Sequence, residues 1–165
     1  MEVKIGNRRL KMIDGKICIV RFSKLGVEVK SGKFTPLNFC LSSNNGGYLT
    51  TNITTYGQQR YFTKHRLVWK MAHPDWDIFD SSQDNFIDHI NRDKMDNSLE
   101  NLRKVPHQHN TWNTNAKGCC FEKESGKWRA KITLNYKDIY LGKFDTEEEA
   151  HTSYLQAKLK YHVIV

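Results

Sequence analysis

The pattern of apolar and polar positions predicts a strand-rich chain with short helices. Apolar or alternating runs bounded by Gly, Asn and Asp are typical of strands, and four of them lie at residues 16–22, 27–30, 48–54 and 59–63. Apolar positions at helical spacing predict a short amphipathic helix over residues 64–72, and Pro74 ends it. Because only 38% of the residues are hydrophobic, several small sheets packed on helices are expected rather than one large core. The predicted fold class is α+β.

The segment from residue 86 to residue 110 has a different pattern. A short apolar run leads into Asp88 and His89, and a polar, turn-rich stretch follows over residues 91–98. Apolar positions return at Leu99, Leu102 and Val105. Pro106 then predicts the start of a helix running to about Asn115, because proline is tolerated at the first helical position. The prediction is strand, long loop, strand and helix, which is a ββα unit.

The polar residues of this segment suit phosphodiester hydrolysis, which needs a base for the attacking water and a Lewis acid for the developing charge. His89 qualifies as the base, because an unperturbed histidine has a pKa near ~6.5 and is largely neutral at pH 7. Asp88 and Asn110 offer the oxygen ligands that Mg²⁺ and Mn²⁺ prefer, and Mg²⁺ needs only one or two protein ligands. Neighbouring strand residues point to opposite faces. Asp88 and His89 therefore share a site only if the strand ends or is distorted there.

A second pattern of strands and a helix follows near the C-terminus. Strands are predicted over residues 118–121, 127–134 and 137–144, with a turn at 124–126. Thr146 is expected to cap a helix whose first turn carries three glutamates, where acidic groups favour the helix dipole. A hinge is predicted at residues 116–118. The expected domains are a basic β-rich N-terminal region (1–47), a central domain (48–116) and a C-terminal domain (117–165).

The charge distribution favours a polyanionic partner. The net charge is +8, and residues 1–60 hold ten Lys and Arg against three acidic residues. Residues 86–116 are neutral, with four residues of each sign. A neutral site flanked by positive regions suits a nucleic acid crossing it. The alternative is an ordinary basic surface.

The remaining composition narrows the class of protein. No stretch approaches the ~18 apolar residues of a membrane span, and the N-terminus has no apolar run of a secretory signal. The four cysteines form no C-x-x-C pair, which disfavours structural zinc and favours reduced thiols. We expect a cytoplasmic protein with no membrane association and no obligate protein partner.

The central segment resembles the HNH endonucleases, most closely the phage homing type. The resemblance rests on DHINRDKMDNSLENLR from Asp88, on HRLV from His65, and on Asn110. It implies a ββα-metal nuclease with one Mg²⁺ or Mn²⁺ per active site, and it assigns the site residues in order. His89 would be the general base, Asn101 would brace the loop beside it, and Asp88 and Asn110 would bind the metal. Many relatives have histidine where this chain has Asn110, so weaker metal binding is expected.

The C-terminal segment resembles the APETALA-type DNA-binding domain of plant ethylene-response factors. The resemblance rests on Gly-Lys-Trp-Arg-Ala from Gly126, Leu-Gly-x-Phe from Leu141, and a helix with Ala150, Tyr154 and Ala157. It implies a three-stranded sheet plus helix that reads double-stranded DNA. Cys120 departs from the family, where many members have an arginine that contacts DNA. The predicted DNA contacts, together with one from the first helix, are Arg66, Lys127, Trp128, Arg129, Lys131 and Lys137.

These patterns predict a metal-dependent DNA endonuclease, of site-specific homing type, that nicks or cuts both strands. The main alternative is a DNA-binding regulator with an inactive nuclease remnant, and another is a structure-specific or RNA-directed nuclease. Trp128 has a second interpretation as a core residue of the small C-terminal module. A calcium loop at residues 91–98 is disfavoured because Asp96 stands where the EF-hand needs glycine. His107 and His109 do not lie on one helix face, which disfavours zinc.

Overall fold

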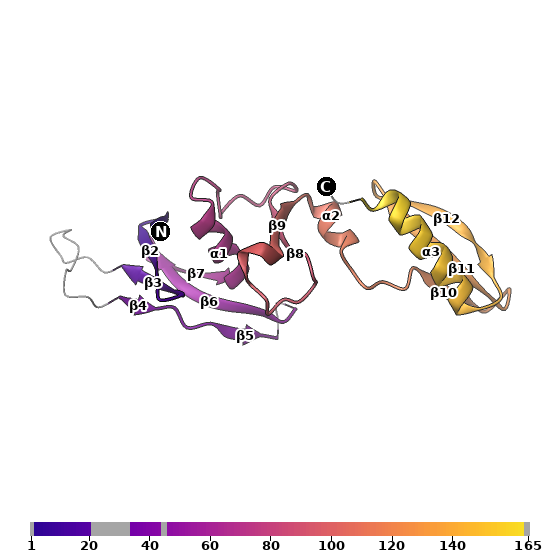
Figure 1. Ribbon diagram of the computed structural model, residues 1–165, viewed down its shortest axis with the longest axis horizontal. Helices are drawn as coiled ribbons and strands as arrows, with labels where there is room; N and C mark the ends of the chain where they lie inside the picture. Colours follow the sequence, from indigo (N-terminus) through magenta and orange to yellow (C-terminus); the bar gives the residue numbers. More distant parts are fainter. Residues whose placement is uncertain (1, 21–33, 44–45, 164–165) are drawn as a thin grey trace. The chain divides into compact units, whose positions relative to one another are not determined.

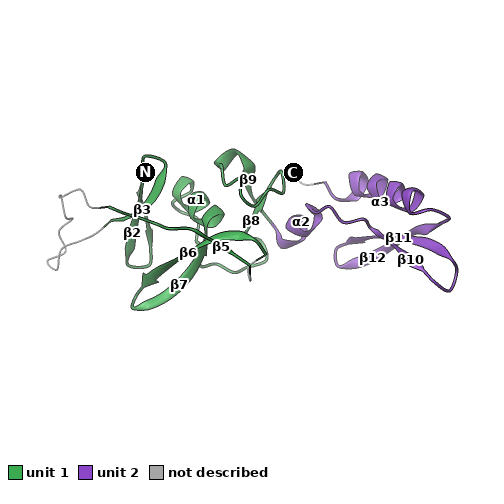
Figure 2. Ribbon diagram, turned by 90° about the horizontal axis from the view of Figure 1, so that it is seen from below, with its two compact units in different colours: residues 1–105 green, residues 106–165 purple. Residues whose placement is uncertain are grey.

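The chain forms two compact units, residues 1–105 and residues 106–165, in a computed structural model that describes residues 2–20, 34–43 and 46–163 (Figures 1 and 2). The described residues form several small sheets with few helices, as the sequence predicts. Among them, no helix is both long enough and apolar enough to cross a bilayer. Each unit is described separately below.

The first unit begins with an antiparallel sheet in the order β1-β2-β3-β4. Its strands are β1 (Glu2–Ile5), β2 (Arg8–Ile13), β3 (Lys16–Val20) and β4 (Thr35–Pro36). Strand β3 starts where the sequence predicts it. Residues 21–22 of that prediction, and the strand predicted over residues 27–30, lie outside the described residues.

A second sheet and the first helix follow in the same unit. The sheet has the order β5-β6-β7, with β5 (Cys40–Ser42), β6 (Tyr48–Thr55) and β7 (Gln58–Thr63). The β6–β7 hairpin turns through Tyr56 and Gly57, whose φ values of 50° and 77° suit a two-residue turn of the type that matches strand twist. Helix α1 (Lys64–Ala72) starts directly after β7 and packs against β6, β7 and β1. The predicted helix over residues 64–72 is confirmed.

One apolar core joins these elements. Val3, Leu10 and Ile17 of the N-terminal sheet belong to the same buried cluster as Ile53 of β6 and Leu67 of α1. The N-terminal sheet is also tied by hydrogen bonds, since Arg8 Nε donates to the Thr54 carbonyl at 2.7 Å. The predicted boundary at residue 47 therefore falls inside one compact unit, and the unit boundary lies at residues 105 and 106 rather than at 116 and 117.

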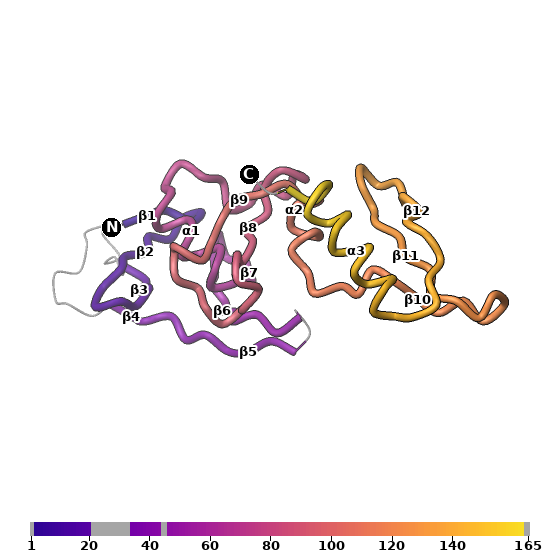
Figure 3. The backbone as a smooth tube through the Cα atoms, turned by 45° about the vertical axis from the view of Figure 1, so that its right-hand side comes forward, coloured from indigo at the N-terminus to yellow at the C-terminus, as the bar shows by residue number. Residues whose placement is uncertain are grey.

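The first unit ends with the strand pair of the central segment. Strands β8 (Phe86–His89) and β9 (Leu102–Val105) are antiparallel neighbours, and the short 3-10 helix η1 (Leu99–Asn101) leads into β9 (Figure 3). The register places Asp88 opposite Arg103 and His89 opposite Leu102. This pair supplies the two predicted strands of the central segment.

The second unit contains helix α2 followed by a sheet and a longer helix. Its elements are α2 (His107–Trp112), β10 (Cys119–Glu122), β11 (Lys127–Leu134), β12 (Lys137–Phe144) and α3 (Glu147–Tyr161). The antiparallel sheet has the order β10-β11-β12, and α3 packs on it around Ile132, Tyr154 and Ala157. The predicted cap is confirmed, because Thr146 Oγ1 accepts from Glu149 N at 3.2 Å in a capping box.

Two local predictions in this unit are corrected. Helix α2 ends at Trp112 rather than near Asn115, because a tighter turn takes over, with Thr114 N donating to the Trp112 carbonyl at 2.9 Å. The segment predicted as a hinge, residues 116–118, is packed against the module at Gly118. Gly118 has φ +66°, a Cβ there would collide with the Tyr154 ring, and its carbonyl accepts from Lys131 N at 3.0 Å.

Candidate active site

Strand β8 ends in the two residues that the sequence singles out for chemistry. Asp88 is 6% exposed and His89 is 4% exposed. His89 is the last residue of β8, and Ile90 N then donates to the Asn101 carbonyl at 2.8 Å as the chain enters the loop. The strand thus ends at His89, which is the condition under which neighbouring residues can serve one site.

The Asp88 carboxylate is held by Arg103 from the neighbouring strand. Arg103 Nε and Nη2 both donate to Asp88 Oδ2, at 2.9 Å and 2.8 Å. A buried carboxylate without a partner is costly, and this charge-assisted pair offsets the cost of burying Asp88. Arg103 was not among the predicted site residues.

Two aromatic rings lie against His89. The His65 ring of α1 meets it edge-on, with centroids 4.9 Å apart and planes at 74°, and the Tyr48 ring of β6 stacks beside it at 5.9 Å and 27°. Burial lowers the pKa of His89 below its ordinary value, while a hydrogen bond with Asn97 and the charge of Asp88 act in the opposite direction. A neutral imidazole is the form that accepts a proton.

His65 is buried beside these groups at the start of α1. It is 7% exposed, and its Nε2 lies 3.3 Å from the Thr63 hydroxyl. Burial, together with the neighbouring His89 and Arg66, lowers the pKa of His65 to about 3. His65 is therefore neutral over the physiological range.

Asn101 connects the two ends of the polar loop. Its Oδ1 accepts from Asn91 N at 2.9 Å, and its Nδ2 donates to the Asp96 carbonyl at 2.8 Å. Within the loop, Asp93 and Asp96 accept from backbone N–H groups two residues further on, which closes local turns. These contacts are the bracing expected of Asn101, while its part in catalysis remains a proposal.

The oxygen donors of the central segment suit a hard divalent cation. Asp88 supplies a carboxylate in the first unit and Asn110 supplies an amide in the second. Asn110 lies within α2, where its N–H donates to the Pro106 carbonyl at 3.1 Å. Within the described ranges, no group of three His, Cys, Asp or Glu side chains is clustered for metal binding. Mg²⁺ does not require such a group, because it keeps several waters and takes substrate oxygens.

Arg66, predicted to contact DNA, holds the loop that follows α1. Its guanidinium donates to the carbonyls of Ile78 at 2.7 Å and Asn85 at 3.3 Å, and lies 4.8 Å from the Trp76 ring centroid. These contacts fix the acidic loop that leads into β8. A DNA contact by Arg66 remains a prediction.

The sheet of the second unit divides the other predicted DNA contacts between two faces. Lys127, Arg129 and Lys131 alternate along β11 and are exposed. Trp128 lies on the opposite face with the buried Ala130, and its ring meets Phe121 edge-on at 5.5 Å. The structure therefore does not place Trp128 beside the three basic residues. Lys137, the remaining predicted contact, is exposed at the start of β12.

The basic side chains of this sheet are paired with acidic ones. Lys131 Nζ lies 2.6 Å from Asp138 Oδ2, Lys127 Nζ lies 3.1 Å from Asp145 Oδ1, and Lys143 pairs with Glu122. These pairs lie at the surface, where ion pairs contribute little to stability because water and salt screen them. Competing anions such as DNA phosphates can therefore replace the acidic partners at little cost.

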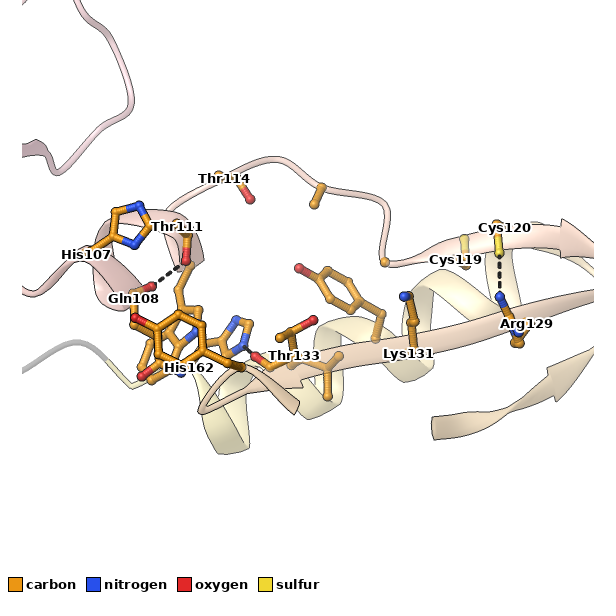
Figure 4. A pocket seen from close by; sticks show the side chains of 16 residues that line it. His107, Gln108, Thr111, Thr114, Cys119, Cys120, Arg129, Lys131, Thr133 and His162 are labelled. Atoms are coloured by element: carbon orange, nitrogen blue, oxygen red, sulfur yellow. Dashed lines mark hydrogen bonds between the residues drawn. The ribbon is translucent and has the colours of Figure 1, made fainter. Parts of the chain in front are cut away.

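A cavity of about 560 Å³ lies in the second unit between α2 and the sheet-and-helix module. Figure 4 shows His107 and Gln108 of α2 near one end of this cavity and Cys120 with Arg129 at the other. Trp112 of α2 stacks on His162, with centroids 4.5 Å apart and planes at 6°, and His109 stacks on Trp112 at 4.6 Å. Helix α2 is thus anchored to residues that follow α3.

The central segment resembles a known protein family. Residues 62–111 match the protein family described as HNH endonuclease. No curated protein and no solved structure matched the chain. The matched range contains His65, Asp88, His89, Asn101 and Asn110. The match supports a nuclease, and it includes neither the N-terminal sheet nor the C-terminal sheet and helix.

Proposed function

We propose that this protein is a metal-dependent endonuclease that hydrolyses phosphodiester bonds of double-stranded DNA. The observation that carries the proposal is the burial of Asp88 and His89 at the end of β8, each held by its own partners. This pair lies inside the segment that matches the HNH endonucleases. A buried carboxylate next to a buried imidazole is a costly arrangement that a purely structural strand end does not need.

Each residue of the site has a distinct task in this proposal. His89 accepts the proton of the attacking water. Asp88 and Asn110 would hold a divalent cation, which when bound stabilises the negative charge that develops on the phosphate. Arg103 orients the Asp88 carboxylate, and Asn101 keeps the loop after His89 in place.

The C-terminal sheet is the proposed DNA reader. Its exposed face carries Lys127, Arg129, Lys131 and Lys143, and the exposed acidic partners of these side chains can yield to phosphates. If this module prefers particular DNA sequences, the enzyme would cut at specific sites, as the resemblance to phage homing enzymes also suggests. The competing proposal is a DNA-binding regulator, favoured only if the nuclease centre is inert.

The test is cleavage of supercoiled plasmid by the full chain with Mg²⁺, Mn²⁺ or EDTA. We expect nicked or linear products with metal and none with EDTA. Substituting His89→Ala should lower the rate by about 10²–10⁴-fold with nearly unchanged DNA binding. His73→Ala, at an exposed histidine of the same unit, is the matched control and should cut at the wild-type rate. Tight DNA binding without cleavage under every metal condition would reject the endonuclease proposal in favour of a DNA-binding regulator.

A further inference from the structure

His89, the proposed general base, lies against two aromatic rings that come from outside residues 86–110. Tyr48 comes from β6 and His65 from α1, and each contacts the His89 ring and the other, with Tyr48 and His65 centroids 5.0 Å apart. The three rings form a closed triangle of contacts. The orientation of the His89 imidazole is therefore set by tertiary packing as well as by its own strand.

Both neighbouring rings are themselves held in place. The Thr63 hydroxyl, at the N-terminal boundary of α1, is directed to His65 Nε2 and makes no hydrogen bond to the helix backbone. Lys94 Nζ lies 4.8 Å from the centroid of the Tyr48 ring and donates to the Gly46 carbonyl at 2.7 Å. A side chain that is packed on fixed neighbours has fewer accessible rotamers, which is what a preorganised site requires.

His65 has no evident acid–base task of its own. It is 7% exposed, and across residues 2–20, 34–43 and 46–163 no hydrogen-bonding group reaches its buried Nδ1. A buried ring nitrogen without a partner costs free energy. Apart from the contact between its Nε2 and the Thr63 hydroxyl, the His65 ring interacts with His89 and Tyr48, which points to a contribution of shape.

We propose that His65 is a positioning residue for His89, and that its ring edge fixes the orientation in which the His89 imidazole takes a proton from the attacking water. The inference rests on the proposed nuclease function. It extends the site beyond residues 86–110 to the first turn of α1. It also predicts that an aromatic ring, rather than a histidine as such, is what position 65 must supply.

The experiment compares His65→Phe, His65→Leu and His65→Ala in single-turnover plasmid cleavage with saturating Mn²⁺ and the enzyme in excess over DNA. We expect the Leu and Ala variants to be slower by about 10–100-fold, the scale of a misplaced catalytic group, with an unchanged enzyme concentration for half-maximal rate. His65→Phe should remain within a few-fold of the wild type. His73→Phe, the same replacement at an exposed histidine of the first unit, is the matched control and should behave like the wild type.

A second measurement separates this inference from the nuclease proposal. The ring protons of His89 are assigned by NMR using His89→Ala, and their shifts are compared between the wild type and each variant at fixed pH. We expect large changes in His65→Leu and small ones in His65→Phe. If the wild type cuts no DNA, the nuclease function fails and catalytic positioning fails with it, while the shifts still show whether His65 sets the ring orientation.

Two results would overturn the inference. A folded His65→Leu variant that cuts at the wild-type rate and leaves the His89 resonances unmoved would show that the ring contact is incidental. A His65→Phe variant as slow as His65→Leu would show that the nitrogen atoms matter rather than the ring. If His65→Ala fails to fold, the Phe and Leu pair, which are similar in volume, still decide.

Discussion

The place of α2 in the second unit should depend on one side chain, Trp112. Helix α2 has six residues, and a helix that short is not stable in water by itself. Trp112 is 8% exposed and stacks on His162, beyond the end of α3. The perturbations are Trp112→Ala and a truncation after Ala116, which removes His162. Trp112→Ala should release α2 from the sheet-and-helix module, and the truncation should leave α2 without the module that supports it.

The magnitude follows from the burial of the ring. A buried aromatic side chain covers roughly 150–250 Å², which at about 25 cal/mol per Å² gives about 4–6 kcal/mol. Replacing a buried Trp by Ala typically costs about 3–5 kcal/mol. The main apolar cluster of the unit, with Ile132, Tyr154 and Ala157, does not include Trp112. The loss should therefore appear as local release of α2, with the rest of the module folded.

Hydrogen exchange followed by mass spectrometry is the assay. Amide exchange in α2, including the Asn110 N–H that donates to Pro106, should accelerate by at least about 10²-fold, since each ~1.4 kcal/mol is a factor of ten. Exchange in β11 and α3 should change little in the Trp112→Ala variant. Trp112→Phe keeps a stacking ring and should retain most of the protection. Because Asn110 is a proposed metal ligand, both releasing changes should also reduce metal-dependent nicking.

Unchanged exchange of α2 in both the Ala variant and the truncated chain would refute this reasoning. It would mean that α2 is held without Trp112 and without the residues after Ala116. A truncated chain that still nicks plasmid at the full rate would separately remove the C-terminal module from the support of Asn110.

Three further predictions follow from single contacts. Gly118→Ala places a side chain at a left-handed φ of +66° and against the Tyr154 ring, and should lower the free energy of unfolding, measured by thermal unfolding, by about 2–4 kcal/mol. Gly126→Ala, at φ +64° with open space around it, is the control and should lower it by about 1–2 kcal/mol. Arg103→Gln leaves the buried Asp88 carboxylate without its partner and should lower the free energy of unfolding, measured with urea, by about 2–3 kcal/mol. Adding Asp88→Asn should recover part of this loss. Full stability of the Arg103→Gln variant would contradict the pairing. The pKa of His65 is near 3 in the folded protein and ~6.5 in the unfolded chain, so its contribution to the free energy of unfolding is intact above about pH 6.5 and is lost as the pH falls toward 3. His65→Phe should reduce this dependence of stability on pH by up to about 1.4 kcal/mol per pH unit. Curves of stability against pH that run parallel for the two proteins would refute the assignment.

Local signals predicted much of the secondary structure. The helix over residues 64–72, the strands over 127–134 and 137–144 and the cap at Thr146 depend on neighbours within a few residues. Turn chemistry, periodicity and capping are visible in such a window. The polar residues Asp88 and His89 were also found this way, because they interrupt an apolar strand.

The contacts that build the site are not visible in such a window. Arg103 faces Asp88 only because β8 and β9 pair in one register, and the long loop between them does not fix that register by turn geometry. His65 reaches His89 through the packing of α1 on the core. The close packing at Gly118 likewise depends on Tyr154, which follows much later in the chain. Each of these contacts joins segments whose separation in sequence carries no periodic signal.

The boundary between the two units has a practical consequence for recombination. The family match runs from residue 62 to residue 111 and therefore crosses the junction at residues 105 and 106. A graft that joins residues 117–165 to a different nuclease would carry His162 but not α2. It would therefore separate Trp112 from the His162 ring on which it stacks. A graft that begins at Pro106 transfers helix and support together. The segment to transfer is thus one helix longer than the proposed DNA-reading sheet, and it carries Asn110, a proposed metal ligand, with it.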